Sequence, residues 1–142
     1  MTETAGSTTK IKDIMTTSVV SVTLNDPIRR VLQLSKKHNV TGFPVVDIKR
    51  RVIGVVSTLD LITGVAVGKL NLRLGELPLA IKVEKNVIKL RPDTPVKNAL
   101  LSLIKKRVGR IVIIDDNNRL CGIVSRKDII NYFIDINKLG KV

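Results

Sequence analysis

The chain has 142 residues, enough for one domain around one core, and its 44% hydrophobic and 26% charged residues are typical of a globular protein. Twenty-five Lys and Arg against twelve Asp and Glu give a net charge of +13, which favours polyanionic partners without identifying one. Every apolar run is far shorter than the ~20 residues of a membrane span, no apolar leader is apparent, and the single cysteine excludes an internal disulfide. We therefore expect a cytoplasmic protein that does not cross a membrane.

The sequence contains an internal repeat. Val19–Ile62 aligns with Val87–Ile130 at a constant offset of 68 residues and without a gap. Most positions keep their apolar or polar character, so we interpret the alignment as a duplication. Identical pairs include Pro27 with Pro95, Gly54 with Gly122, Ser57 with Ser125 and Asp60 with Asp128.

The first copy predicts a β-α-β-β-α order. A proline at the first helical turn with an N-cap residue before it indicates a helix start, and a polar segment between two apolar runs indicates a turn. The expected elements are a strand at Val19–Val22, a helix from Pro27 capped by Asp26, a strand at Phe43–Val46, a turn at Asp47–Arg51, a strand at Val52–Ser57 and a helix from Thr58.

The second copy predicts the same order. Its elements are a strand at Val87–Leu90, a helix from Pro95 capped by Thr94, a strand at Ile111–Ile114, a turn at Asp115–Arg119, a strand at Leu120–Ser125 and a helix from Arg126. The strands are apolar on successive residues, as expected for strands that are covered on both faces. We predict an α/β (α+β) fold in which two β-α-β-β-α repeats pack about a pseudo-twofold axis.

The predicted boundaries place repeat 1 at residues 10–66, a linker at 67–83 and repeat 2 at 84–136. Residues 1–9 and 137–142 are expected to be flexible tails. Within the linker, Leu72–Leu77 loosely resembles Ile11–Met15.

A serine followed three residues later by an aspartate ends the third strand of each copy. Gly54-Val-Val-Ser57-Thr58-Leu-Asp60 is one case and Gly122-Ile-Val-Ser125-Arg126-Lys-Asp128 is the other. Taken alone, this spacing favours a capping box at a helix N-terminus. The alternative is a ligand site, because a carboxylate can accept hydrogen bonds from both hydroxyls of a ribose while the helix N-terminus attracts phosphate.

These motifs, with Lys12-Asp-Ile-Met15-Thr16 before the first strand, Phe43-Pro-Val-Val-Asp47 and Gly109-Arg110-Ile-Val-Ile-Ile-Asp115, resemble a tandem CBS domain pair, or Bateman module, over about residues 10–136. The order of motifs in both copies carries the resemblance, since none of them is specific alone. The resemblance implies a stand-alone regulatory or sensor protein that binds AMP, ADP, ATP or S-adenosylmethionine between its repeats. It also implies a homodimer that acts on a separate effector protein.

The resemblance further implies two composite clefts. Arg110 would bind phosphate in the first cleft, whereas Gly42 stands at the equivalent position of the second cleft, where Arg126 would have to replace it. The first cleft would consist of Ser57, Thr58, Asp60, Asn86, Val87, Ile88, Val108 and Arg110. The second would consist of Thr16, Ser18, Val20, Val40, Gly42, Ser125, Arg126 and Asp128.

Other residues favour structural roles. His38 is expected at a helix C-terminus and Cys121 in the core, while Tyr132 or Phe133 is expected to face a partner chain. No nucleophile, acid–base set or metal-ligand cluster is apparent, so we predict no enzyme activity and no cofactor. The net charge leaves a nucleic-acid-binding protein or a scaffold as alternatives, although three aromatic residues are few for base stacking.

Overall fold

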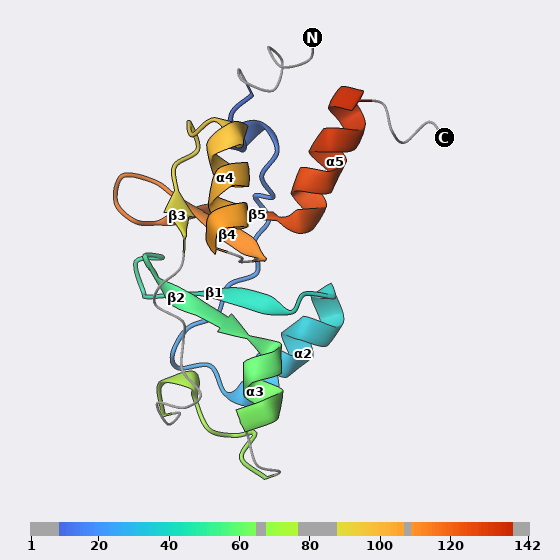
Figure 1. Cartoon of the computed structure of the whole chain (residues 1–142). Helices are drawn as coiled ribbons and strands as arrows, with labels where there is room; N and C mark the ends of the chain where they lie inside the picture. The colour runs from blue at the N-terminus through green and yellow to red at the C-terminus, as the bar shows by residue number, and fades with distance from the viewer. Residues whose placement is uncertain (1–8, 65–67, 77–87, 107–108, 138–142) are drawn as a thin grey trace. The chain divides into compact units, whose positions relative to one another are not determined.

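A computed structural model describes residues 9–64, 68–76, 88–106 and 109–137 (Figure 1). The predicted site residues Asn86, Val87 and Val108 lie outside the described residues. The chain forms two compact units, each described by itself below. Unit 1 consists of Met1–Val19 and Ile88–Val142, and unit 2 consists of Val20–Val87.

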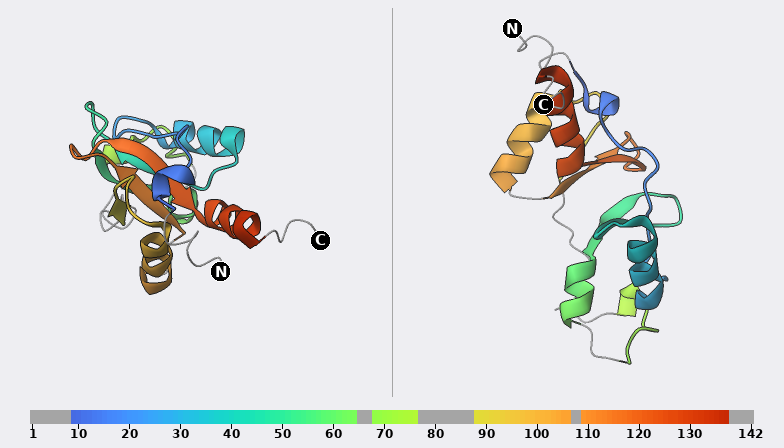
Figure 2. Two further views of the ribbon diagram at one scale, coloured as in Figure 1. Left: turned by 90° about the horizontal axis from the view of Figure 1, so that it is seen from above. Right: turned by 90° about the vertical axis from the view of Figure 1, so that its right-hand side faces the viewer.

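Unit 2 is an antiparallel hairpin with two helices on one side of it (Figures 1 and 2). Its elements are α2 (Ile28–His38), β1 (Gly42–Val46), β2 (Val52–Ser57), α3 (Thr58–Gly64) and the 3₁₀ turn η2 (Leu74–Glu76). All five residues of β1 are buried, as the continuous apolar run predicts. The core consists of Val22, Ile28, Val31, Phe43, Val45, Val56, Leu61 and Leu74.

Unit 1 is a three-stranded sheet of order β3-β4-β5, with α4 and α5 on one side of it (Figure 2). Strands β3 and β4 run parallel, and β4 and β5 run antiparallel. The elements are η1 (Ile11–Asp13), β3 (Lys89–Leu90), α4 (Val96–Lys106), β4 (Arg110–Ile114), β5 (Leu120–Ser125) and α5 (Arg126–Asn137). The core consists of Ile11, Ala99, Ile111, Ile113, Val124 and Ile129.

The strand predicted at Val19–Val22 is wrong: this segment makes one parallel bridge, between Val22 and Val45. The Val22 amide donates to the Pro44 carbonyl over 3.0 Å. The next bond of the ladder would come from the amide of residue 44, and a proline has no N–H to donate. In the second copy Val112 stands at this position, and its amide donates to the Ile88 carbonyl over 3.0 Å. The strand predicted at 87–90 therefore forms, although it is shorter than predicted, at Lys89–Leu90.

Both first helices begin one residue later than predicted. Pro27 is the N-cap of α2 and has an extended backbone, with φ −72° and ψ 154°, and no side chain caps the helix. The carboxylate of Asp26, the predicted N-cap, instead accepts a 2.8 Å hydrogen bond from the Thr23 amide. The first amides of the helix have backbone acceptors instead: those of Ile28 and Arg29 donate to the Leu72 and Leu70 carbonyls, both over 2.9 Å. Helix α4 likewise begins at Val96, after Pro95.

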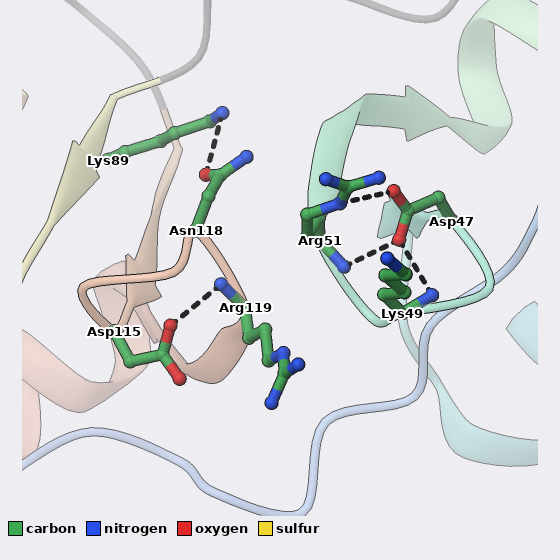
Figure 3. Close-up of polar contacts among 7 residues, drawn as sticks. All are labelled: Asp47, Lys49, Arg51, Lys89, Asp115, Asn118 and Arg119. Carbon is green, nitrogen blue, oxygen red and sulfur yellow. Dashed lines mark hydrogen bonds and ion pairs between the residues drawn. The ribbon is translucent and has the colours of Figure 1, made fainter.

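The two predicted turns form with the same local chemistry (Figure 3). Asp47 Oδ1 accepts hydrogen bonds from the Lys49 and Arg51 amides, both over 2.9 Å. In the second copy, Asp115 Oδ1 accepts from the Asn117 and Arg119 amides over 2.8 and 2.9 Å. The duplicated aspartate therefore fixes each hairpin turn.

The N-terminal segment and the linker each form a 3₁₀ turn, in agreement with the loose similarity between Ile11–Met15 and Leu72–Leu77. In unit 1 the 3₁₀ turn η1 buries Ile11, whose amide donates to the Thr94 carbonyl over 2.8 Å. In unit 2 the 3₁₀ turn η2 buries Leu74, whose amide donates to the Asp26 carbonyl over 2.9 Å. The N-terminal segment thus completes the compact unit of the second repeat. Among the described residues no helix is both long and apolar enough to span a bilayer.

Candidate functional site

The Ser-x-x-Asp motif of unit 1 forms a carboxylate-centred cluster at the start of α5. Asp128 Oδ2 accepts hydrogen bonds from the Ser125 amide over 2.9 Å and from the Ser125 hydroxyl over 3.2 Å. Asp128 Oδ1 accepts from the Thr16 hydroxyl over 3.1 Å. The capping interpretation therefore holds for Asp128, and the same carboxylate also binds a residue that is 112 positions away in the sequence.

Thr16 reaches Asp128 because its backbone pairs with β5. The Thr16 amide donates to the Ile123 carbonyl and the Ile123 amide donates to the Thr16 carbonyl, both over 2.9 Å. Gly122 makes this close approach possible: a Cβ at that position would lie 2.8 Å from Met15 Sδ and 2.9 Å from the Thr16 oxygen. The glycine of the motif thus admits the segment that carries Thr16.

Two arginines lie beside this cluster. Arg110 is the first residue of β4 and is paired with Ser125 in the register of β4 and β5, and Arg126 follows Ser125 directly. Burial lowers the pKa of Arg110, and the positive charge of Arg126 lowers it further. The sequence prediction grouped Arg110 with Asp60, whereas the strand register puts Arg110 next to the motif of its own repeat. Unit 1 therefore collects two cations and the N-terminus of a 12-residue helix at one end of β5.

The motif of unit 2 has different chemistry at the equivalent positions. Thr58 is 6% exposed, and its amide and hydroxyl both donate to the Thr41 carbonyl, over 2.9 and 3.1 Å. The Ser57 hydroxyl accepts a 3.2 Å hydrogen bond from the Leu59 amide. Gly42 is paired with Ser57, where unit 1 has Arg110. The side chain of Asp60 lies outside the described part of the chain.

The remaining predicted site residues lie in separate places within the units. Val20 and Val40 pack against the core of unit 2, Ile88 packs against the core of unit 1, and Ser18 is exposed. The structure brings Thr16, Ser125 and Asp128 together by hydrogen bonds. The two clefts that would join residues of both units remain predictions.

A cavity of about 210 Å³ in unit 1 was not anticipated from the sequence. It extends along α5 from Asp128, and the helix supplies Asn131, Tyr132 and Asp135 to it. These residues follow the i, i+3, i+4, i+7 spacing of one helix face, so that part of the lining could have been read from the sequence. Asp13 and Ile14, which complete the lining, come from the distant η1 segment. In the described ranges no group of three or more His, Cys, Asp or Glu side chains could hold a metal ion.

The other singled-out residues have structural surroundings. His38 ends α2, as predicted. Cys121 is half-buried on β5 against the core of unit 1, and burial, together with the charge of Asp115, raises the pKa of its thiol. Tyr132 is buried and Phe133 is 39% exposed, with their ring centroids 5.9 Å apart.

The repeated order of elements, with its two Ser-x-x-Asp motifs, agrees with the sequence comparison. Residues 11–66 and 79–135 match the CBS domain. The chain belongs to the CBS domain family. It is a tandem CBS pair with a mixed α/β fold of two repeats, as the resemblance predicted.

Relatives of different lengths match this CBS pair. It is 30% identical to protein MJ1426 of Methanocaldococcus jannaschii, with 87% of this chain and 90% of the relative covered. It is also 30% identical to protein MJ1232 of the same organism. That match covers 85% of this chain but only 38% of the relative.

Two solved structures are similar to the pair. The CBS domain pair of protein MJ0100, solved with 5′-methylthioadenosine and S-adenosyl-L-methionine, has 26% identity and a TM-score of 0.74 over 88% of this chain and 95% of that one. CBSX2 in complex with AMP has 24% identity and a TM-score of 0.76 over 90% of this chain and 98% of that one, which shows the fold.

Proposed function

We propose that this CBS pair is a regulatory module that binds an adenosyl ligand, and that its principal site surrounds Asp128. The observation that carries the proposal is the set of hydrogen bonds that Ser125 and Thr16 make to the Asp128 carboxylate at the start of α5. Such a carboxylate is oriented before a ligand arrives, which reduces the entropy lost on binding. Complexes of MJ0100 with S-adenosyl-L-methionine and of CBSX2 with AMP support the ligand class.

The hydrogen bonds at Asp128 indicate how a ribose would bind. Two ionised oxygens offer about four acceptor positions, and three bonds within the chain use them here. A ribose diol needs two positions, so it must displace a hydroxyl or share an oxygen with one. Thr16 is exposed and bonds to Oδ1 alone, so its hydroxyl is the contact that a ligand replaces most easily.

Arg110 and Arg126 are the proposed phosphate contacts of the same site. Arg110 is paired with Ser125 across β4 and β5, and Arg126 follows Ser125 in the chain. Burial lowers the pKa of Arg110, and repulsion by the charge of Arg126 lowers it further. A bound phosphate would relieve this repulsion, and the N-terminus of α5 favours an anion at the same place. We therefore expect AMP, ADP or ATP to bind here.

The second proposed site, around Ser57, Thr58 and Asp60, would bind phosphate more weakly. Gly42 supplies no cation where unit 1 has Arg110, and the hydroxyl of Thr58 already donates to Thr41. Asn86, Val87, Ile88 and Val108 are the residues that the family resemblance adds to this site.

We further propose that the pair has no catalytic activity of its own, acts on a separate effector protein and forms a homodimer. Exposed apolar side chains at equivalent positions of the two repeats support the dimer: Ile62 on α3 is 63% exposed and Ile130 on α5 is 56% exposed. Nucleic-acid binding is the second candidate, favoured by the net charge of +13.

Calorimetric titration with ATP, AMP and S-adenosylmethionine tests the proposal on the wild type and on Asp128→Ala, Arg110→Ala and Asp60→Ala. Loss of a charge-assisted contact should weaken one binding step about tenfold to hundredfold. Asp128→Ala and Arg110→Ala should affect the same step, and the double variant should lose little more than the stronger single one.

The outcome that would contradict this grouping is specific. If Arg110→Ala weakens the step that Asp60→Ala removes and leaves the Asp128 step intact, the arginine serves the other repeat. If none of the three ligands binds while a DNA or RNA duplex binds with a steep dependence on salt, the nucleic-acid alternative is correct.

A further inference from the structure

The turn between β1 and β2 differs in chemistry from the turn between β4 and β5, although the two form the same hydrogen bonds (Figure 3). Both turns begin with an aspartate and end with an arginine. Between these, residues 48–50 are Ile-Lys-Arg, whereas residues 116–118 are Asp-Asn-Asn. Because the second turn forms with an acidic and two amide side chains, the backbone does not require the apolar and basic residues of the first.

Arg50 has a backbone conformation that favours a different residue type. Its φ is 64°, and the equivalent Asn118 has a φ of 61°. This left-handed conformation is strained for most side chains, and asparagine tolerates it best after glycine because its amide can bond to the nearby backbone. The remaining non-glycine residue with a positive φ in the described ranges is also an asparagine, Asn39. Arginine is therefore a poor choice for this turn, which indicates a role for Arg50 outside the turn.

Ile48 contributes nothing to the core of unit 2, since its side chain is 98% exposed. Single exposed apolar residues are common, but this one lies beside two exposed cations, Lys49 and Arg50. Asp47 and Arg51 neutralise each other in a 2.7 Å ion pair, which leaves the turn with a charge of +2 from Lys49 and Arg50. The turn thus combines one protruding aliphatic side chain with uncompensated positive charge.

An anionic lipid surface matches this combination better than the other polyanions do. Its phosphates attract the cations, and its headgroup region adapts to a single inserted side chain without a preformed pocket. A nucleic acid would contact the cations through its phosphates but would leave Ile48 in water. The net charge of +13 adds long-range attraction to an anionic surface.

We propose that the β1–β2 turn attaches this CBS pair peripherally to an anionic membrane surface. Ile48 inserts among the headgroups, and Lys49 and Arg50 contact the lipid phosphates. The turn belongs to unit 2, whereas the proposed adenosyl site surrounds Asp128 of unit 1. The proposal therefore goes beyond the proposed function and does not depend on it.

Cosedimentation of the full chain with vesicles at physiological ionic strength tests the proposal. The wild type should bind vesicles that contain phosphatidylglycerol and should not bind vesicles of phosphatidylcholine alone. Ile48→Asn leaves the net charge unchanged and should lower the partition coefficient about threefold to tenfold, because one partly inserted aliphatic side chain is lost. The matched control is Leu59→Asn, which should leave the partition coefficient unchanged. Leu59 is 65% exposed on α3, which follows the end of β2 that is remote from the turn.

Arg50→Asn tests the cation and guards against loss of folding. It should lower the partition coefficient about threefold to fivefold, the effect of one cation at an anionic surface. Lys36→Asn removes the same charge from the end of α2 that leads into β1, remote from the turn, and should lower the coefficient less than about twofold because salt screens distant charges. Since asparagine suits a φ of 64°, Arg50→Asn should keep or raise the melting temperature. A lower melting temperature would contradict the role assigned to Arg50.

Three results of the vesicle assay would overturn the proposal. These are no binding to phosphatidylglycerol vesicles, equal binding of Ile48→Asn and Leu59→Asn, and equal losses in Arg50→Asn and Lys36→Asn. Poly-L-glutamate then separates a membrane from an acidic protein partner, because it supplies carboxylates without an apolar phase. The polymer should bind the wild type and Ile48→Asn equally. Weaker binding of the polymer to Ile48→Asn would assign the turn to an acidic polypeptide instead of a lipid surface.

Discussion

Replacing Gly122 with alanine tests whether the N-terminal segment that carries Met15 and Thr16 builds the proposed site of the second repeat. The added Cβ would meet Met15 Sδ at 2.8 Å and the Thr16 oxygen at 2.9 Å, and the second of these atoms belongs to the backbone. Real Cβ atoms are not found so close to other atoms, so the segment that carries Thr16 must move away from β5.

The expected cost follows from the contacts that this movement breaks. Thr16 and Ile123 exchange two backbone hydrogen bonds of 2.9 Å, worth about 1 kcal/mol each, and the Thr16 hydroxyl then loses Asp128. Alanine also restricts the unfolded chain relative to glycine, which returns about 0.4–1 kcal/mol. The net destabilisation is about 1–2 kcal/mol, which lowers the melting temperature by about 3–8 °C in a chain of this size.

Gly109→Ala provides the matched control, because a Cβ at Gly109 would have no atom within 4 Å. Its melting temperature should stay equal to that of the wild type or rise slightly. Thr16→Val then separates the backbone from the hydroxyl: it keeps the bridge to Ile123 and removes only the bond to Asp128. Calorimetric melting and adenosyl-ligand titration of all three variants measure both effects. Equal melting temperatures for Gly122→Ala and Gly109→Ala would refute the reasoning.

Two further predictions concern the assembly and the turns. The double variant Ile62→Glu/Ile130→Glu should be a monomer in light scattering, because it places charges on the exposed apolar surface of the proposed dimer. The control Ile48→Glu, at a turn residue that is 98% exposed, should remain a dimer. A monomeric wild type would contradict the proposed dimer. The backbone hydrogen bond from Arg119 is the main cause that lowers the pKa of Asp115 below its ordinary 3.8. This carboxylate therefore stabilises the fold above pH 3.8, and its contribution is lost as the pH falls through its folded-state pKa. The fall in melting temperature between about pH 5 and about pH 3 should therefore be shallower in Asp115→Asn than in the wild type, and identical slopes would exclude the effect.

Much of the fold could be predicted because the same strand and turn patterns occur in both copies of the repeat. The strands Val52–Ser57 and Leu120–Ser125 have the predicted bounds, and both turns form around the duplicated aspartate. The strand predicted at Val19–Val22 does not form, and the reason lies in the neighbouring strand β1. Pro44 of β1 has no N–H to donate, whereas Val112, at the equivalent position of β4, donates its amide to Ile88. Local propensity at Val19–Val22 carries no information about that missing donor.

The candidate site was predictable in its residue types and less so in its grouping. Ser125 and Asp128 are close in sequence, so their contact follows from helix geometry. The family resemblance placed Thr16 and Asp128 in one cleft but predicted no contact between them. The hydrogen bond between them, and the close approach at Gly122 that permits it, appear only in three dimensions. The cavity needed both α5 and the distant Asp13, a combination that helical periodicity alone cannot supply.

The residues beside the Ser-x-x-Asp motif differ in chemical character between the repeats, and this difference bears on function. The turn aspartates and the motif serines are identical in both copies, because the same backbone must form twice. The residues next to the motif diverge as a set: Thr41 and Gly42 in one copy correspond to Gly109 and Arg110 in the other. In unit 2 the Thr58 hydroxyl donates to the Thr41 carbonyl, and in unit 1 the residue at that position is the exposed Arg126. One copy therefore uses these positions for an internal hydrogen bond and the other for positive charge, which is the pattern expected if one half of the duplicated chain binds an anionic ligand more strongly than the other.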